Sequence, residues 1–263
     1  MVDMQGRLIG KRFQAEYFLD SAHEETHGCD YLLANDMDME PVPGYAAASW
    51  EKGYGDFVLK PDLTTLRKLP WLEGTALVLA DVLDHHHHDV ATFAAGDAQA
   101  PSGRLAAKKL RAFCASELEF YLFDETYRVG GGQALLRPAD GRQLHRGLPY
   151  PADEQGGGAS CAPSGVDCRA PAFPVENSKG EWGPGQEEIN VRYADALEMA
   201  DRHVILKNAI KEIAHAQGKA VTFMAKWRYD LAGSSATSTS RCGTRRERNP
   251  CFMRPSPSTA CRS

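Results

Sequence analysis

Residues 116–123 alternate between acidic or polar and apolar side chains, and this period of two predicts a β-strand. Glu117 and Glu119 then point to one face, and Leu118 and Phe120 point to the other. The two carboxylates lie roughly 7 Å apart along the strand. Carboxylates that share a face repel each other, and a divalent cation with its preference for oxygen ligands removes that conflict. A solvated sheet face is the alternative interpretation.

A second acidic group occurs within residues 179–190. Glu181 precedes a turn rich in glycine and proline, and Glu188 lies on the strand that leaves this turn. Two acidic strands in one chain favour a cation site over a solvated face more strongly than either strand does alone.

The first 84 residues are predicted to form a small β-rich domain. Residues 3–13 have the pattern of a strand, a turn and a second strand, and residues 57–60 that of a short strand ended by Pro61. Residues 75–82 are continuously apolar, which is typical of a buried strand.

Residues 195–217 have the clearest helical pattern. Asp195 and Glu198 match a capping box, and Gly218 supplies the stop. Apolar residues recur along it at helical spacing: Leu206, Ile210 and Ile213. Residues 221–226 then have a strand pattern, so an α/β or α+β second domain is expected.

The composition narrows the class of protein. The net charge of −5 and the pI of about 6.0 argue against a nucleic-acid-binding surface. No apolar run approaches the ~18 residues of a membrane span, and residues 1–13 lack the core of a signal peptide, so we expect a cytoplasmic protein without a membrane partner. The seven cysteines show no CxxC metal-binding spacing.

Four consecutive histidines follow the apolar strand, at positions 85–88. Consecutive residues of an extended chain cannot all point at one metal ion, because successive side chains alternate in direction. An exposed loop is therefore favoured over a metal site.

Five stretches resemble the type I glutamine synthetase family, and within it the branch of γ-glutamylpolyamine and γ-glutamylethanolamide synthetases. They occur in family order: DMQGRLIGKRF (3–13), SWEKGYGDFVLKPDLTTLRKLPW (49–71), SELEFYLF (116–123), VENSKGEWGPGQEEINVRY (175–193) and VTFMAKW (221–227). The resemblance implies an α+β fold. Residues 1–84 would form an N-terminal β-grasp domain that lacks its first strand, and residues 105–235 part of a catalytic domain built on a curved antiparallel sheet with helices.

The resemblance also implies roles for individual residues. Four glutamates would hold Mg²⁺ or Mn²⁺: Glu117, Glu119, Glu181 and Glu188. Glu176 would face the nucleotide, and Gly233 would lie against the substrate glutamate. Trp50 and the catalytic Asp56 would come from the neighbouring subunit of a ring-shaped homo-oligomer and lie near the amine.

The implied reaction is ATP-dependent ligation of L-glutamate to ammonia or an organic amine. The γ-phosphoryl group of ATP would pass to the glutamate side chain, and the amine would attack the resulting γ-glutamyl phosphate. Phosphoryl transfer of this kind depends mainly on positioned metals and charge stabilisation. Glutamine synthetases carry an aspartate before the tryptophan that helps to deprotonate ammonium, whereas the loop at residues 43–49 has no carboxylate. An organic amine is therefore the expected substrate.

The chain departs from the family after Gly233. The family's His-x-His motif, which includes a metal ligand, is replaced by ATSTSRCG from Ala236 onward. With freely chosen codons, a two-base shift converts this string to HIHISLW, and one-base shifts within 92–103 and 142–157 also give segments similar to the family. Frame disruption is thus the preferred explanation for three segments expected to be irregular: 92–104, 128–173 and 236–263. Natural irregular loops are the alternative.

Two functional hypotheses remain. The chain is a glutamate–amine ligase by descent, or it is an inactive, truncated remnant that at most binds a divalent metal or associates with intact homologues. Loss of the histidine ligand and of the phosphate-binding half predicts no turnover by the polypeptide as it stands. A glycosidase with paired carboxylates fits poorly, because no sugar cleft is indicated.

Overall fold

The computed structural model describes residues 1–3, 6–36, 38–44, 53, 55–90, 102–123, 126–127 and 174–244, with backbone alone for 241–244. The named elements are α1 (Ala15–Tyr17), the π-helical turn η1 (Phe18–Ala22), β1 (Thr26–Cys29), the 3₁₀ helix η2 (Asp30–Leu33), β2 (Asp56–Lys68), β3 (Ala76–Leu83), β4 (Leu110–Phe123), β5 (Val175–Gly180), β6 (Gln186–Asp195), α4 (Ala196–Ala216), β7 (Ala220–Thr222) and β8 (Ala236–Thr244). They form two antiparallel sheets, with strand orders β1-β2-β3 and β5-β6-β4-β7, and β8 also pairs with β4. This is an α+β arrangement, as expected. No helix among these residues is long and apolar enough to cross a membrane.

The small sheet corrects the expected end of the strand at Pro61. β2 runs through Pro61, which lies opposite Ala80 of β3. On the other side, β1 begins at Thr26, which pairs with Leu59, so position 61 has a strand partner on one side only. A proline without a backbone N–H is tolerated at such an edge position.

The strand–turn–strand expected at residues 3–13 is present in the described part of this segment only as a minimal antiparallel pairing around a turn. It reduces to a single bridge between Val2 and Leu8. The carboxylate of Asp3 accepts hydrogen bonds from the backbone N–H and the Nε of Arg7, and this local bonding closes a tight turn at Gly6, whose φ is +73°. Side-chain capture of nearby backbone competes with strand pairing.

Two further expectations concern the strand at 75–82 and the histidines that follow it. The strand expected at 75–82 is β3. Only Val82 is buried and its neighbours are mostly half-exposed, so the prediction of a buried strand holds for that residue alone. Residues 85–88 form an exposed turn, which confirms the loop interpretation.

The large sheet confirms the two acidic strands. β4 contains residues 116–123, and β6 carries Glu188 directly after the predicted turn. β7 is shorter than the strand expected at 221–226, because the carbonyl of Ser235 accepts the backbone N–H of Glu119, the β4 position that a longer β7 would reach.

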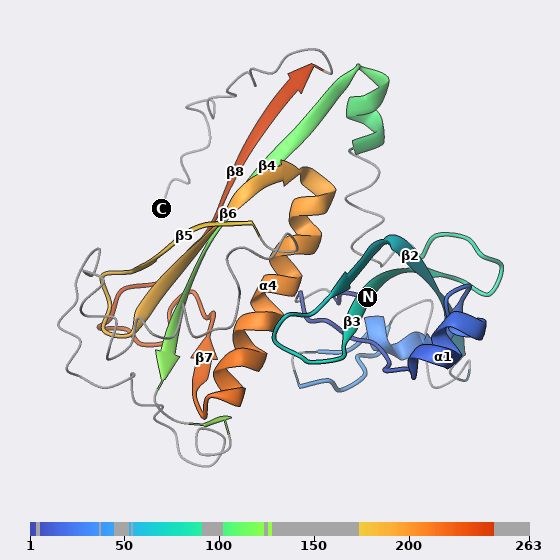
Figure 1. Cartoon of the computed structure of the whole chain (residues 1–263), viewed down its shortest axis with the longest axis horizontal. Helices are drawn as coiled ribbons and strands as arrows, with labels where there is room; N and C mark the ends of the chain where they lie inside the picture. The colour runs from blue at the N-terminus through green and yellow to red at the C-terminus, as the bar shows by residue number, and fades with distance from the viewer. Residues whose placement is uncertain are drawn as a thin grey trace.

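The expectation of irregular structure at 236–263 was wrong for residues 236–244. These residues form β8, which pairs with β4 from Ala236 opposite Leu118 to Thr244 opposite Leu110 (Figure 1). The pairing of β8 with β4 is made by backbone hydrogen bonds, which Thr and Ser can form as well as apolar residues, and Thr has a high β-propensity. Residues 102–104 also belong to a helical turn, 102–107. The rest of the three segments expected to be irregular lies outside the described residues.

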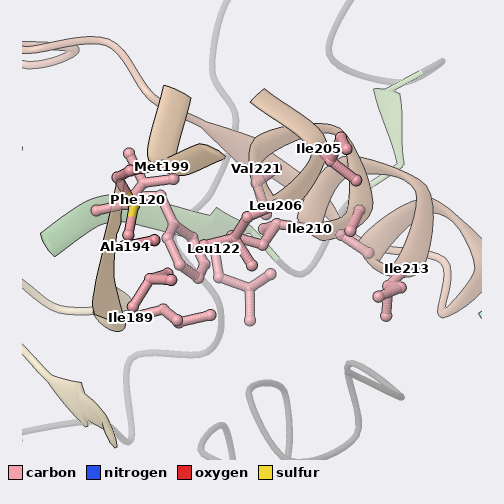
Figure 2. Close-up of a cluster of buried hydrophobic side chains, with 14 residues drawn as sticks. Phe120, Leu122, Ile189, Ala194, Met199, Ile205, Leu206, Ile210, Ile213 and Val221 are labelled. Atoms are coloured by element: carbon pink, nitrogen blue, oxygen red, sulfur yellow. The ribbon is translucent and has the colours of Figure 1, made fainter. Parts of the chain in front are cut away.

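α4 packs on one face of the large sheet and buries the main hydrophobic core (Figure 2). The core joins alternate residues of β4 and β6 to the apolar side of α4: Leu118, Phe120, Leu122, Ile189, Val191, Ile205, Leu206 and Ile210. The helix begins as predicted, with the carboxylate of Asp195 accepting the backbone N–H of Leu197, and it ends before Gly218, whose φ is +72°. Glu198 pairs with Arg202 instead of closing a capping box.

The other side of α4 faces the small sheet, so the helix lies between the two sheets (Figure 1). Trp71 donates its indole N–H to Glu212 at 2.6 Å. Leu77 and Leu79 of β3 pack against the core of the large sheet. The two sheets therefore share one helix as a common support.

Asp201 of α4 makes this packing sensitive to pH. The pKa of Asp201 is raised from 3.8 to about 6, chiefly by burial. Arg67 opposes this rise, and the carboxylates of Asp62, Asp81 and Glu198 add to it. The native state therefore binds more protons than the unfolded state between these two values, and the free energy of unfolding falls as pH rises through this window.

We expect Asp201→Asn to remove this fall. Urea unfolding of both proteins at about pH 3 and about pH 7 measures the effect, because these pH values lie below and above the window. The native chain should lose stability relative to the Asn variant at the higher pH. Equal pH dependence in the two proteins would contradict the assignment.

Candidate functional site

A row of three charged side chains crosses the large sheet. Lys179 of β5 is directly opposite Glu188 of β6, and Glu188 is directly opposite Glu119 of β4. Directly opposed residues have Cβ atoms about 5 Å apart. The neighbouring residues of β4, Leu118 and Phe120, enter the core beneath α4. The charged row therefore lies on the face opposite the helix.

Glu119 is held by hydrogen bonds from two other segments. Gln186 donates its Nε2 to one carboxylate oxygen at 2.9 Å, and the backbone N–H of Ser235 donates to the same oxygen at 3.1 Å. The hydroxyl of Ser235 donates to the other oxygen at 2.5 Å. These three hydrogen bonds fix the orientation of the carboxylate.

Gln186 is the residue that joins the parts of this site. It is 3% exposed, and its Oε1 accepts the backbone N–H of Gly183 at 2.9 Å. Besides Glu119, its Nε2 donates to the carbonyl of Gly233 at 2.9 Å. One amide thus connects the turn before β6, the carboxylate on β4 and the segment before β8.

Lys179 bridges the two glutamates of the second acidic group. Its ammonium group donates to Glu181 and, at 2.5 Å, to Glu188. Burial lowers the pKa of Lys179, but the hydrogen bonds to both carboxylates outweigh it, and the pKa is raised. Lys179 is therefore a fixed positive charge at neutral pH.

The pKa values of the two carboxylates are shifted in opposite directions. Burial and the negative charge of Glu181 raise the pKa of Glu188, although Lys179 opposes them. Burial acts in the same direction on Glu181, but the hydrogen bond from Lys179 outweighs it and lowers that pKa. Two carboxylates in contact repel each other, so a second cation would stabilise the ionised pair.

Glu117 lies one step further along β4, directly opposite Asn190 of β6 and Thr237 of β8. Asn190 donates its Nδ2 to the Oδ1 of Asn177 at 3.1 Å. The Oδ1 of Asn190 is buried and has no hydrogen-bond partner, so it is an available oxygen ligand beside Glu117.

The structure gathers the four predicted metal ligands but does not close a coordination shell. Glu117, Glu119 and Glu188 share one face, and Glu181 joins Glu188 through Lys179. Within the described part of the chain, no three His, Cys, Asp or Glu side chains converge closely enough to hold a metal ion. The metal assignment therefore stays a prediction.

The chemistry of the site fits a hard divalent cation. Its donors are carboxylate oxygens and the unpartnered Oδ1 of Asn190. Lys179 places a positive group between Glu181 and Glu188, which marks the position where these carboxylates accept a cation. Coordination of a metal there would require the ammonium group to separate from both carboxylates.

The other predicted site residues are scattered. Glu176 is exposed on β5, at the irregularity of its pairing with β6. Gly233 contacts Gln186, as described above. Asp56 begins β2 in the other sheet and is exposed, whereas Trp50 and positions 45–49 of the preceding loop lie outside the described residues. The roles of these residues stay predictions.

The sequence reasoning missed four residues that build the site: Lys179, Gln186, Asn190 and Ser235. A signal was present for two of them. Gln186 and Asn190 have the same parity as Glu188 on one strand, so a period of two places them on the face of Glu188. The contact between Ser235 and Glu119 joins residues 116 positions apart and has no local signature.

Several known proteins are similar to this chain in sequence. Residues 98–242 match the catalytic domain of glutamine synthetase. A gamma-glutamylethanolamide synthetase of Streptomyces coelicolor is 41% identical over 244 residues, covering 89% of this chain and 50% of the relative. A glutamate–isopropylamine ligase of a Pseudomonas species is 32% identical over 245 residues, covering 89% of this chain and 51% of the relative.

A solved structure of GmaS without ligand has a TM-score of 0.77 and 22% identity, and the similarity covers 97% of this chain and 56% of that one. A GmaS complex with ADP gives a TM-score of 0.73 at the same identity, covering 92% and 51%. At this identity the structural similarity shows the fold alone. The chain spans about half the length of the curated relatives it matches.

Proposed function

This chain belongs to the glutamine synthetase family. From that premise we propose that it acts as an ATP-dependent ligase, which joins L-glutamate to an amine through a γ-glutamyl phosphate. The observation that carries the proposal is the acidic face of the large sheet, with Glu119 and Glu188 side by side. Bound Mg²⁺ or Mn²⁺ would neutralise the phosphate oxygens of ATP during phosphoryl transfer.

The protein's own residues have distinct tasks in this proposal. Glu119, oriented by Gln186 and Ser235, presents its oxygens in a fixed direction. Glu188 and Glu181 supply further oxygens, with Glu117 beside them. Glu176 would face the nucleotide, and Gly233 would lie against the substrate glutamate.

We propose an organic amine as the second substrate. The loop at residues 43–49 lacks the carboxylate that would hold and deprotonate ammonium. The relatives named as a gamma-glutamylethanolamide synthetase and a glutamate–isopropylamine ligase support this proposal. Trp50 and Asp56 would lie near the amine of a neighbouring subunit in a ring, and the small sheet would belong to a β-grasp domain.

Titration of the purified chain with Mn²⁺, followed by the EPR signal of the free ion, tests the cation site. We expect binding that Glu119→Gln and Glu188→Gln each weaken at least about tenfold, because each removes a charged ligand while keeping its shape. Glu24→Gln, at an exposed position of the first domain, is the matched control. Equal affinity in all four proteins would contradict the assignment.

Glutamate-dependent ADP release in the presence of Mg²⁺ then distinguishes ligase from inactive relative. Release that requires an amine and is lost in Glu188→Gln supports the ligase. Cation binding without ADP release supports the inactive alternative, for which the replacement of His-x-His after Ala236 argues. A higher yield with ammonia than with ethanolamine, isopropylamine and polyamines would refute the organic-amine proposal.

A further inference from the structure

We propose that the ammonium group of Lys179 is a built-in counter-ion that occupies the cation position between Glu181 and Glu188, and that a divalent cation binds by displacing it. The inference rests on the proposed cation site and adds a residue that controls its affinity. In this inference Lys179 competes with the metal ion for the same two carboxylates.

The geometry supports a competing role. Lys179 donates to Glu181 and Glu188 together, so the same carboxylate oxygens that a metal would use are engaged by the ammonium group. The side chain of Glu188 is 7% exposed, and those of Lys179 and Glu181 are each 26% exposed. Water therefore screens the charges of Lys179, Glu181 and Glu188 less than it screens charges at the protein surface.

The position of Lys179 in the sheet permits its release. β5 is paired on one side only, with β6, among the described strands. A lysine has four rotatable carbons and a strongly hydrated head group, so the ammonium can leave for water while its backbone stays paired opposite Glu188. A divalent ion would bring the second positive charge that one ammonium cannot supply to two carboxylates.

The charge balance of the site agrees with this exchange. Glu119 receives its hydrogen bonds from the neutral groups of Gln186 and Ser235. Lys179 is therefore the cation that the structure places on the Glu181–Glu188 pair, and its removal leaves two adjoining carboxylates without a positive partner. Such a pair binds the next available cation more strongly.

Mn²⁺ titration of Lys179→Met is the direct test. We expect Lys179→Met to bind Mn²⁺ about tenfold more tightly than the native chain, because the metal no longer displaces two charge-assisted hydrogen bonds. Lys179→Arg, which keeps the positive charge, should show no gain. Lys108→Met, at an exposed position remote in sequence, makes the same change in net charge and should match the native chain.

The outcomes separate this inference from the proposed function. Unchanged or weaker binding by Lys179→Met, with Glu188→Gln still defective, overturns the displacement and leaves the cation site intact. Absence of Mn²⁺ binding in both the native chain and Lys179→Met overturns the cation site and the displacement together.

Chemical labelling gives an independent readout on the unmodified sequence. Lysines are acetylated briefly with and without saturating Mn²⁺, and peptides are quantified by mass spectrometry. Labelling of Lys179 should rise several-fold with Mn²⁺ as its amine is freed, whereas Lys108 should not change. Constant or reduced labelling of Lys179 under saturating Mn²⁺ would overturn the displacement.

Discussion

Replacing Leu206 with alanine is expected to lower the free energy of unfolding by about 2–5 kcal/mol. Leu206 has no exposed surface and lies in the core between α4 and the large sheet (Figure 2). Its truncation removes contacts with both and leaves a cavity that the packed strands cannot close. Urea unfolding measured by circular dichroism gives the difference.

Leu63→Ala is the matched control, because the side chain of Leu63 is 50% exposed on β2. The same chemical change there should cost about 0.5 kcal/mol or less. Similar losses in both variants would mean that α4 does not depend on this core for its attachment.

Gly183→Ala is expected to destabilise the fold by about 1–3 kcal/mol and to disturb the acidic face. A Cβ at this position would lie 2.7 Å from the Cζ of Tyr121 and closer still to its hydroxyl oxygen. Tyr121 has no exposed surface, packs its ring edge-on against Trp227 at a centroid distance of 5.5 Å, and donates to the carbonyl of Ala232. The ring cannot move aside without breaking these contacts.

A double-mutant cycle with Tyr121→Leu checks the cause. In the Tyr121→Leu background, adding Gly183→Ala should lower the free energy of unfolding by less than about 0.5 kcal/mol, because the clash with the ring has been removed. Gly10→Ala serves as control, since no atom lies within 4 Å of the added carbon there. Full additivity of the two changes would refute the steric explanation.

The sequence predicted the parts of the fold whose patterns are local. The alternation around Glu117 and Glu119 predicted β4, and the cap at Asp195 predicted the start of α4. In both cases propensity, periodicity and packing favour the same element. The family resemblance, carried by separate motifs in order, is confirmed by the match over residues 98–242.

The missed features depend on contacts between distant residues. β8 forms because β4 offers an unpaired edge, which compensates for a sequence with little apolar pattern. β2 continues past Pro61 because its pairing with β1 reaches only as far as Leu59, so the proline leaves no β1 partner unbonded. The bridging position of Lys179 depends on the register of β5 against β6, which a single sequence does not define.

The amide of Gln186 has a mechanical consequence. Its oxygen holds the turn at Gly183, and its nitrogen holds both Glu119 and the carbonyl of Gly233. A displacement of the backbone at Gly233 must therefore either rotate this amide or stretch its bond to the carboxylate. The position of the Gly233 backbone and the orientation of the Glu119 carboxylate are thus coupled through one nearly inaccessible side chain.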